Sequence, residues 1–272
     1  MHQAALRRLR LDACYRAFEI DPAQVRTALR ALPLFGFWGV NVTIPYKEKV
    51  LSLLDAVDAE AAAIGAVNTV VVREGRLIGY NTDAEGFRRA VEVAGRTGLN
   101  GARVLVVGAG GAARAVAFAC LARGCHSLLI ANRSVARART LSSALRANFP
   151  AADIATVATG GQAWLRQASD CGVVVNTTPL GGRPDDPLPV PRAALRRDQT
   201  VVDIVYRPRR TPLLSAAAAA GARTVDGLQM LLHQGELAFT LWTGRDAPTA
   251  VMRRALAVAA AEAERRAKGL AS

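Results

Sequence analysis

Lysine is rare in this basic chain, and one lysine stands in a run of residues suited to chemistry. Nearly all basic residues are arginine, and the lysines are Lys47, Lys49 and Lys268. Arginine cannot be deprotonated in a protein, whereas burial and neighbouring charges can tune a lysine ammonium to exchange protons near neutral pH. Lys47, in Asn41-Val42-Thr43-Ile44-Pro45-Tyr46-Lys47, is therefore a candidate acid/base. The alternative is a retained surface lysine.

Two further polar residues accompany it in the first third of the chain. Asn68 lies at the start of a strand-like run, and Asp83 lies where a strand-like run gives way to a helix-like one. Loops at such junctions carry binding and catalytic groups in α/β folds. Each residue alone also has a structural interpretation, Asn68 as a turn residue and Asp83 as a helix cap.

The elements that position these residues alternate between strand and helix patterns. This alternation is typical of a parallel α/β sheet. Prolines 22, 45, 212 and 248 stand where a helix would have its first turn, with Asp21 and Thr211 as candidate caps. The predicted strands are Ala13–Phe18, Gly36–Val42, Val67–Val72, Val104–Gly108, Leu128–Ala131, Val173–Asn176, Val201–Val205 and Arg223–Val225.

A dinucleotide-binding motif follows the strand that ends near residue 108. The glycines Gly108, Gly110 and Gly111, with Ala109, Ala112 and Ala113, match G-x-G-x-x-G/A between a buried strand and a helix start. Gly108 permits the tight turn, Gly110 admits the pyrophosphate, and the helix N-terminus supplies N–H groups and a positive dipole. We predict a dinucleotide cofactor here.

The residues in the turn after the next predicted strand indicate which dinucleotide the site binds. An NAD site places an acidic residue there for the ribose 2′-hydroxyl. This chain has Asn132, Arg133, Ser134 and Arg137 instead, which suit a 2′-phosphate, so NADP is predicted. The alternative for Arg137 is one more arginine on a helix surface.

The chain is long enough for two domains. A polar segment that contains glycines, residues 95–101, separates the two predicted domains. We predict an α/β substrate domain of residues 1–99 plus 227–272, with a parallel-rich sheet, and a Rossmann-type NADP-binding domain of residues 100–226. The last helices, about 228–242 and 248–268, are expected to return to the first domain.

Bulk composition narrows the class of protein. The 272 residues carry a net charge of +13, which would attract polyanions, but the arginines are scattered and no nucleic-acid-binding motif is present. The four cysteines form no C-x-x-C pair, so no metal site or disulfide framework is predicted and a cytoplasmic location is favoured. No membrane-spanning segment is evident. A small-molecule enzyme, monomer or homodimer, is the expectation.

Several segments together resemble shikimate dehydrogenase and its quinate-using relatives. They are NVTIPYK, AVNT, NTDAEG, GAGGAAR, NRSVAR, NTTPLG and DGLQMLLHQ, in order over nearly the whole chain. The resemblance implies a two-domain enzyme that uses NADP to interconvert 3-dehydroshikimate and shikimate by hydride transfer at C3, in a cleft. It implies Lys47 as acid/base with Asp83 beside it.

The resemblance also implies the remaining site residues. Ile204 and Gly227 would lie on the nicotinamide side, and residues 176–181 would pass near the cofactor. A quinate or aminoshikimate dehydrogenase, an inactive NADP-binding paralogue and, more distantly, a methylenetetrahydrofolate dehydrogenase are the alternatives. The implied substrate ligands are Thr43, Asn68, Asp83, Tyr206 and Gln234.

The sequence departs from the family at its start. Family members begin with a strand and a loop whose two serines bind the substrate carboxylate, and a His-Asn pair then opens the first helix. Here His2 and Gln3 stand at that pair, so the strand and both serines are absent. From ordinary strand and loop lengths we expect about twenty further native residues before Met1; a degenerate paralogue is the alternative.

Overall fold

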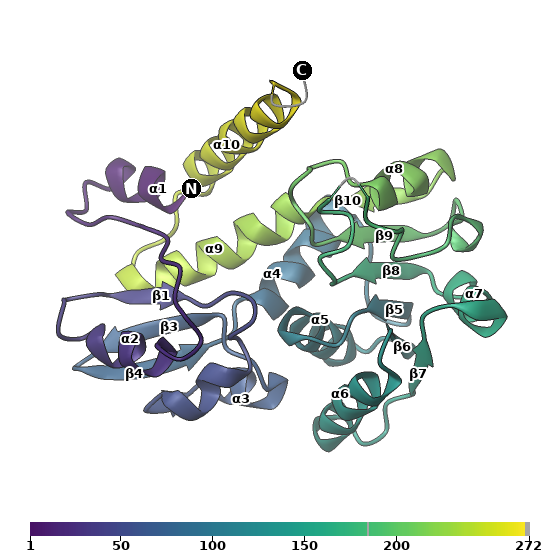
Figure 1. The fold of residues 1–272 in the computed structure, drawn as a ribbon, viewed down its shortest axis with the longest axis horizontal. Helices are drawn as coiled ribbons and strands as arrows, with labels where there is room; N and C mark the ends of the chain where they lie inside the picture. Colours follow the sequence, from purple (N-terminus) through teal and green to yellow (C-terminus); the bar gives the residue numbers. More distant parts are fainter. Residues whose placement is uncertain (184, 270–272) are drawn as a thin grey trace.

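The first of two β-sheets carries the candidate catalytic residues. The computed structural model describes residues 1–183 and 185–269, and this sheet has four strands in the order β1-β3-β4-β2 (Figure 1). The strands are β1 (Gly39–Asn41), β2 (Ala56–Val57), β3 (Thr69–Arg73) and β4 (Arg76–Tyr80). Short helices flank them: α2 (Val25–Ala31), η1 (Lys49–Leu53) and α3 (Ala59–Ile64).

This sheet is not parallel-rich, so that part of the prediction is wrong. β1 pairs antiparallel with β3 and β3 antiparallel with β4, while β2 pairs parallel with β4. The antiparallel β3–β4 pair results from the two-residue turn between them, Glu74 and Gly75, both with positive φ (51° and 75°). Such a turn returns the chain directly alongside itself as a hairpin.

The predicted strand Ala13–Phe18 is also wrong, because these residues form no strand in the structure. A strand needs a neighbour to bond its backbone groups. Among the described residues no strand lies beside this segment, and the Tyr15 N–H donates instead to the Gln3 side chain, at 3.0 Å.

The second sheet has six parallel strands in the order β10-β9-β8-β5-β6-β7. Counted from β5, this is the 3-2-1-4-5-6 order of a doubly wound nucleotide-binding fold. Five of its strands were predicted, and β7 was not. The strands are β5 (Arg103–Val107), β6 (Ser127–Asn132), β7 (Ile154–Ala158), β8 (Val173–Asn176), β9 (Thr200–Asp203) and β10 (Arg223–Val225).

Helices connect these strands and cover the sheet. The predicted cap at Thr211 is present: its hydroxyl accepts from the Leu214 N–H at 3.2 Å, and Pro212 is the first helical residue of α8. The helices are α5 (Gly111–Ala122), α6 (Val135–Asn148), α7 (Gly161–Ser169), η3 (Arg192–Ala194) and α8 (Pro212–Ala219).

Two helices join the sheets. α4 (Asp83–Arg89), which continues as η2 (Ala90–Ala94), packs against α9 (Gly227–Thr243) between them (Figure 1). Gly86 makes this contact close, because a Cβ there would lie 2.8 Å from the Gln234 backbone nitrogen. Phe87 of α4, Val104 of β5 and Met230 of α9 belong to one buried apolar cluster. α4 and α9 therefore pack on the core of the six-stranded sheet, whereas Val70 of β3 and Leu77 of β4 belong to a separate buried cluster.

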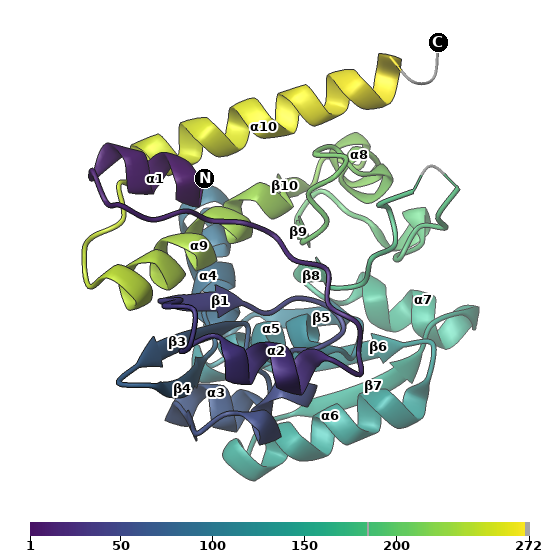
Figure 2. The same cartoon turned by 60° about the vertical axis from the view of Figure 1, so that its left-hand side comes forward.

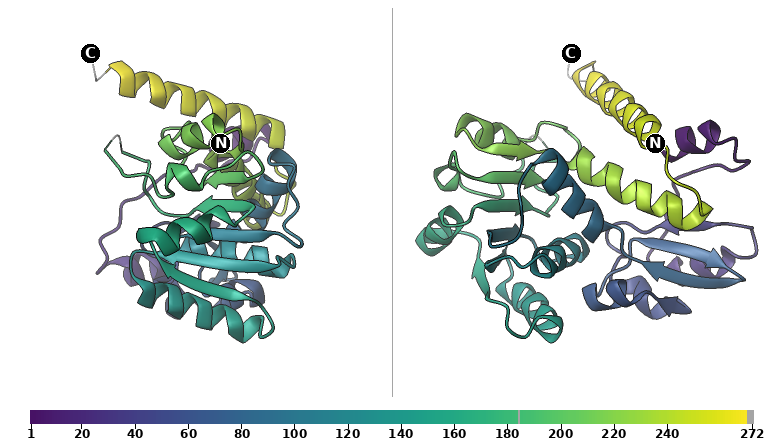
Figure 3. Two further views of the ribbon diagram at one scale, coloured as in Figure 1. Left: turned by 90° about the vertical axis from the view of Figure 1, so that its right-hand side faces the viewer. Right: turned by 180° about the vertical axis from the view of Figure 1, so that it is seen from behind.

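The C-terminal helices return to the first sheet, as predicted. The Trp242 indole near the end of α9 donates to the Val70 carbonyl of β3 at 3.0 Å. α10 (Thr249–Gly269) lies across α9 and against α1 (His2–Arg8), and its far end extends beyond both (Figures 2 and 3). The predicted domain boundaries near residues 99 and 227 stay a prediction. No helix of the described residues has the length and apolarity needed to cross a membrane.

Candidate active site

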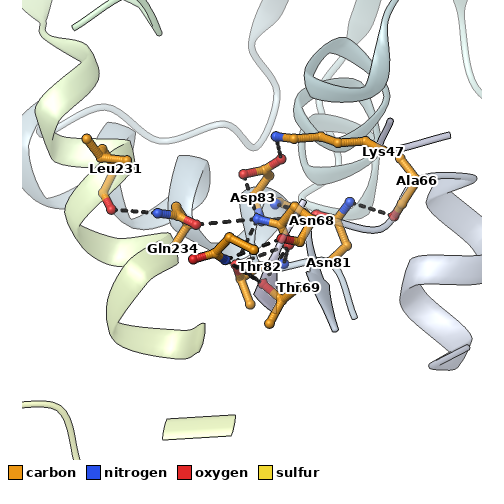
Figure 4. Close-up of polar contacts among 11 residues, drawn as sticks. Lys47, Ala66, Asn68, Thr69, Asn81, Thr82, Asp83, Leu231 and Gln234 are labelled. Atoms are coloured by element: carbon orange, nitrogen blue, oxygen red, sulfur yellow. Dashed lines mark hydrogen bonds and ion pairs between the residues drawn. The ribbon is translucent and has the colours of Figure 1, made fainter. Parts of the chain in front are cut away.

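An ion pair between Lys47 and Asp83 forms the centre of the site. The Lys47 Nζ lies 2.6 Å from the Asp83 Oδ2, and the two side chains are 15% and 5% exposed (Figure 4). The Val67 N–H donates to the Lys47 carbonyl at 2.8 Å, which fixes the lysine backbone at the start of β3. An ammonium and a carboxylate, both largely removed from water, are thus held in contact.

Asn81 places Asp83 at the N-terminus of α4. Its side-chain oxygen accepts from the N–H groups of Asp83 (3.0 Å) and Ala84 (3.3 Å), and its amide donates to the Ala66 carbonyl at 2.8 Å. It therefore caps the helix and ties it to the loop before β3. Asn81 was not among the predicted site residues, although an Asn two residues before an acidic helix start is a capping signal.

Asn68 connects Asp83 to helix α9. Its amide nitrogen lies 2.9 Å from the Asp83 Oδ1, 2.9 Å from the Thr82 hydroxyl and 3.4 Å from the Gln234 Oε1 (Figure 4). Its oxygen accepts from the Thr82 N–H at 2.7 Å. An amide nitrogen has two hydrogens for these three acceptors. At most two of these contacts can be hydrogen bonds from Asn68 at one time, so one acceptor is left without a hydrogen from this amide.

A second layer of polar groups extends outward from Asn68. The Asn41 amide donates to the Asn68 carbonyl (3.3 Å) and the Thr69 hydroxyl (3.2 Å), and the Tyr15 hydroxyl donates to the Asn41 Oδ1 at 2.9 Å. Burial and the nearby Tyr206 raise the pKa of Tyr15 above its ordinary value. Tyr15 was not among the predicted site residues, because no motif marks it.

Two predicted substrate ligands lie at the margin of this network. Thr43 is exposed in the loop after β1. Tyr206 is 40% exposed after β9, and the Arg207 guanidinium lies 5.9 Å from its ring centre. The structure thus brings together four predicted residues, Lys47, Asn68, Asp83 and Gln234, and leaves Thr43 and Tyr206 open to solvent.

The glycine turn after β5 fits a bound pyrophosphate. Gly108 has φ +120°, and a Cβ there would lie 2.4 Å from the Thr177 hydroxyl, so only glycine fits. A Cβ on Gly110 would meet nothing within 4 Å, and no side chain caps α5. The first N–H groups of α5 and the space in front of them match what a diphosphate requires. Ala109 and Ala112 in the same turn are buried.

The turn after β6 fits a phosphate on the ribose. Arg133, Ser134 and Arg137 are exposed there, and the Asn132 amide donates to the Ser134 carbonyl at 2.9 Å. Within the described part of the chain neither guanidinium forms an ion pair. The turn therefore presents two uncompensated cations and a hydroxyl.

Ile204 and Gly227 meet where β9 ends and α9 begins. A Cβ on Gly227 would lie 2.5 Å from the Ile204 carbonyl oxygen, so the approach of the two segments requires glycine. The Ile204 N–H donates to the Asn176 carbonyl at 3.1 Å. These contacts place Ile204 beside residues 176–181, at the carboxyl ends of strands, where ligands bind in open α/β sheets.

The six-stranded sheet, its glycine turn and the adjoining lysine–carboxylate pair define a two-domain, dinucleotide-dependent oxidoreductase. Family models agree in three segments: the shikimate dehydrogenase substrate-binding domain matches residues 1–70, shikimate / quinate 5-dehydrogenase matches 90–163, and the shikimate 5'-dehydrogenase C-terminal domain matches 227–257. The chain belongs to the shikimate dehydrogenase family.

Individual relatives resemble it over most of their length. Shikimate dehydrogenase (NADP(+)) of Moorella thermoacetica is 47% identical, over 94% of this chain and 86% of its own. The Thermus thermophilus shikimate 5-dehydrogenase, solved with NADP(H) and shikimate, is 38% identical with a TM-score of 0.83, over 95% and 94%. Quinate dehydrogenase of Corynebacterium glutamicum, solved with NAD, is 35% identical with a TM-score of 0.85, over 93% and 91%.

Proposed function

We propose that the chain is an NADP-dependent shikimate dehydrogenase that interconverts 3-dehydroshikimate and shikimate. The observation that carries the proposal is the Lys47–Asp83 pair at 2.6 Å, bonded through Asn68 to Gln234. It supplies a proton donor and several hydrogen-bonding groups at one point. The family and the NADP-named relatives support the same reaction.

Lys47 is the proposed acid/base. When bound, the nicotinamide of NADPH supplies a hydride to the C3 carbonyl carbon. The Lys47 ammonium donates its proton to the C3 oxygen as negative charge develops there, and in the reverse direction the amine accepts that proton. Asp83 holds the ammonium in place and accepts from a neighbouring substrate hydroxyl through its remaining lone pairs.

The other site residues recognise the substrate ring and the cofactor. Asn68 and Gln234 orient ring hydroxyls, with Thr43 and Tyr206 at the outer edge. A site that bonds each hydroxyl discriminates strongly against analogues lacking one. The α5 N-terminus with Gly108, Ala109, Gly110, Gly111 and Ala112 holds the pyrophosphate, Asn132, Arg133, Ser134 and Arg137 hold the 2′-phosphate, and Ile204 and Gly227 border the nicotinamide.

The test is a spectrophotometric assay of purified protein. NADP with shikimate is compared with NAD and with quinate. Turnover with the first pair, and a much lower kcat/KM with the other combinations, is the expected result. NADPH binding without turnover of either acid would contradict an enzymatic role and favour an NADP-binding protein.

We also propose a cytoplasmic location and a monomeric or homodimeric state. The four cysteines are free, as a reducing compartment allows. Light scattering during gel filtration distinguishes monomer from dimer, and an assembly larger than a dimer would contradict the proposal.

A further inference from the structure

An ion pair links the helix of the glycine turn to the residue after Lys47. The Arg114 Nε on α5 lies 3.0 Å from the Glu48 Oε2, with side-chain exposures of 15% and 39%. Arg114 belongs to the first turns of the helix that follows β5, and Glu48 to the loop between β1 and η1. The pair therefore joins elements of the two sheets beside the candidate catalytic lysine.

A second contact lies one helical turn away on the same face of α5. A Cβ on Gly111 would lie 2.9 Å from the Lys47 Cβ and 3.3 Å from its Cδ. Residues three apart on a helix are neighbours on its surface, so Gly111 and Arg114 present one continuous face to Lys47 and Glu48. The absence of a side chain at Gly111 lets the lysine stem rest against the helix.

The guanidinium of Arg114 has room because of another glycine. Its Nη1 would lie 3.1 Å from a Cβ on Gly65, the left-handed residue that ends α3. Gly65 and the Glu48 carboxylate thus both adjoin the Arg114 guanidinium. An isolated ion pair of this exposure contributes little to the stability of a fold. Its more consequential effect is to fix where residues 47 and 48 lie relative to α5.

We propose that Arg114 is a positioning residue: through Glu48 it holds Lys47 against the first turn of the helix that receives the cofactor pyrophosphate. The inference rests on the function proposed above. Arg114 itself touches no reacting atom. It keeps the proton donor on one domain in register with the cofactor site on the other, and a shift of about 1 Å in such a group can cost 100-fold in rate.

Kinetics give the first test. Arg114→Gln and Glu48→Gln are each expected to lower kcat by about 10- to 100-fold while the KM values change little. The charge-reversed double variant Arg114→Glu/Glu48→Arg is expected to recover part of that loss. Arg123→Gln is the matched control, because Arg123 at the end of α5 forms a pair of similar length with Glu92, 3.0 Å, and should leave kcat unchanged.

The scarcity of lysine supplies a second readout that does not depend on turnover. Selective ¹³C-lysine labelling gives signals from Lys47, Lys49 and Lys268, which Lys49→Arg and Lys268→Arg assign. The Lys47 Hε–Cε signal should be displaced in Arg114→Gln and in Glu48→Gln, return toward its original position in the double variant, and remain in place in Arg123→Gln.

The outcomes separate the two proposals. An unmoved Lys47 signal together with an unchanged kcat in Arg114→Gln overturns the positioning role. If the unaltered protein reduces no dehydroshikimate, the proposed function fails, and the lysine signal still decides the contact. If Arg114→Gln does not fold, Glu48→Gln carries the test, because Glu48 is the more exposed partner and its replacement removes the same ion pair.

Discussion

The proton-transfer role of Lys47 can be tested separately from its charge by a substitution that keeps a cation but removes the exchangeable proton. Lys47→Arg keeps a cation opposite Asp83, but a guanidinium does not release a proton near neutral pH. We expect kcat to fall by about two to four powers of ten, the usual worth of acid/base assistance. NADPH absorbance measures the rate, and Lys49→Arg, at an exposed position, is the control. Retained turnover in Lys47→Arg would remove the lysine from the mechanism.

We expect Arg133 to determine cofactor choice in the proposed site. In Arg133→Asp the exposed cation becomes the acid typical of NAD sites, so one charge-assisted bond to the 2′-phosphate is replaced by repulsion. A loss of about 1.5–3 kcal/mol corresponds to a rise of about 10- to 100-fold in the KM for NADP. The KM for NAD should fall. Arg139→Asp, on the exposed surface of α6, the helix that follows this turn, controls for the change in charge alone. Unchanged NADP affinity in Arg133→Asp would reject the assignment.

Residue types at single positions indicated much of the site, and the family resemblance implied that Asp83 lies beside Lys47, but other contacts did not follow from the sequence. Lys47, Asn68 and Asp83 stand out because a lysine is rare here and because polar residues at strand ends attract attention. Tyr15 and the Arg114–Glu48 pair could not be found this way. Their contacts join residues 26 and 66 positions apart, and no local pattern encodes such a meeting.

Elements were predictable where one local signal dominated. The buried runs at β5, β8 and β9 read as strands because both faces of a parallel sheet are covered. Ala13–Phe18 contains Arg16 and is largely exposed, and no strand lies beside it among the described residues. β4 was missed because Glu74 and Gly75 give no strong hairpin signal. A distant pairing partner decides the first case and lies outside any sequence window, whereas β4 pairs with β3 directly across that two-residue turn.

One buried carboxylate holds the strand ends beside the proposed nicotinamide position together. Asp203, the last residue of β9, accepts from the Asn176 amide (2.9 Å), the Val205 N–H (3.1 Å) and the Thr211 hydroxyl (2.6 Å). Thr211 in turn caps α8. Asp203 thus fixes the loop after β8, the segment after β9 and the start of a helix relative to one another.

Asp203 gives the fold a pH dependence of defined sign. Burial raises the pKa of Asp203 to about 6, above its ordinary value, although its hydrogen bonds oppose the shift. A carboxyl whose pKa is higher in the folded state stabilises the fold below its unfolded pKa, and this contribution is lost as pH rises through about 6. The shift corresponds to about 3 kcal/mol.

Asp203→Asn should remove this dependence, because an amide resembles the neutral acid at every pH. Urea unfolding at about pH 5 and about pH 7 measures it. We expect the unaltered protein to lose stability relative to Asp203→Asn as the pH rises across that interval. A stability difference that stays constant between the two pH values would show that Asp203 ionises with an ordinary pKa.

At the scale of the whole molecule, the net charge of +13 favours anionic ligands, but screening decides which arginines matter. Charges on the surface act over about 8 Å at physiological ionic strength. The α6 N-terminus carries Arg133, whereas Arg265 and Arg266 are exposed near the far end of α10, on the opposite side of the molecule (Figures 1 and 2). The guanidiniums near the phosphate should therefore dominate cofactor binding.

The contributions of nearby and distant arginines to cofactor binding can be distinguished by NADPH fluorescence titration at increasing salt concentration. The Kd should rise with salt in the unaltered protein, because ion pairing to the phosphate is screened. Arg265→Glu/Arg266→Glu lowers the net charge by four and should leave the Kd and its salt dependence unchanged, whereas Arg133→Asp should raise the Kd and weaken that dependence. If Arg265→Glu/Arg266→Glu raised the Kd as much as Arg133→Asp does, the electrostatic field of the whole protein, rather than the turn after β6, would attract the cofactor.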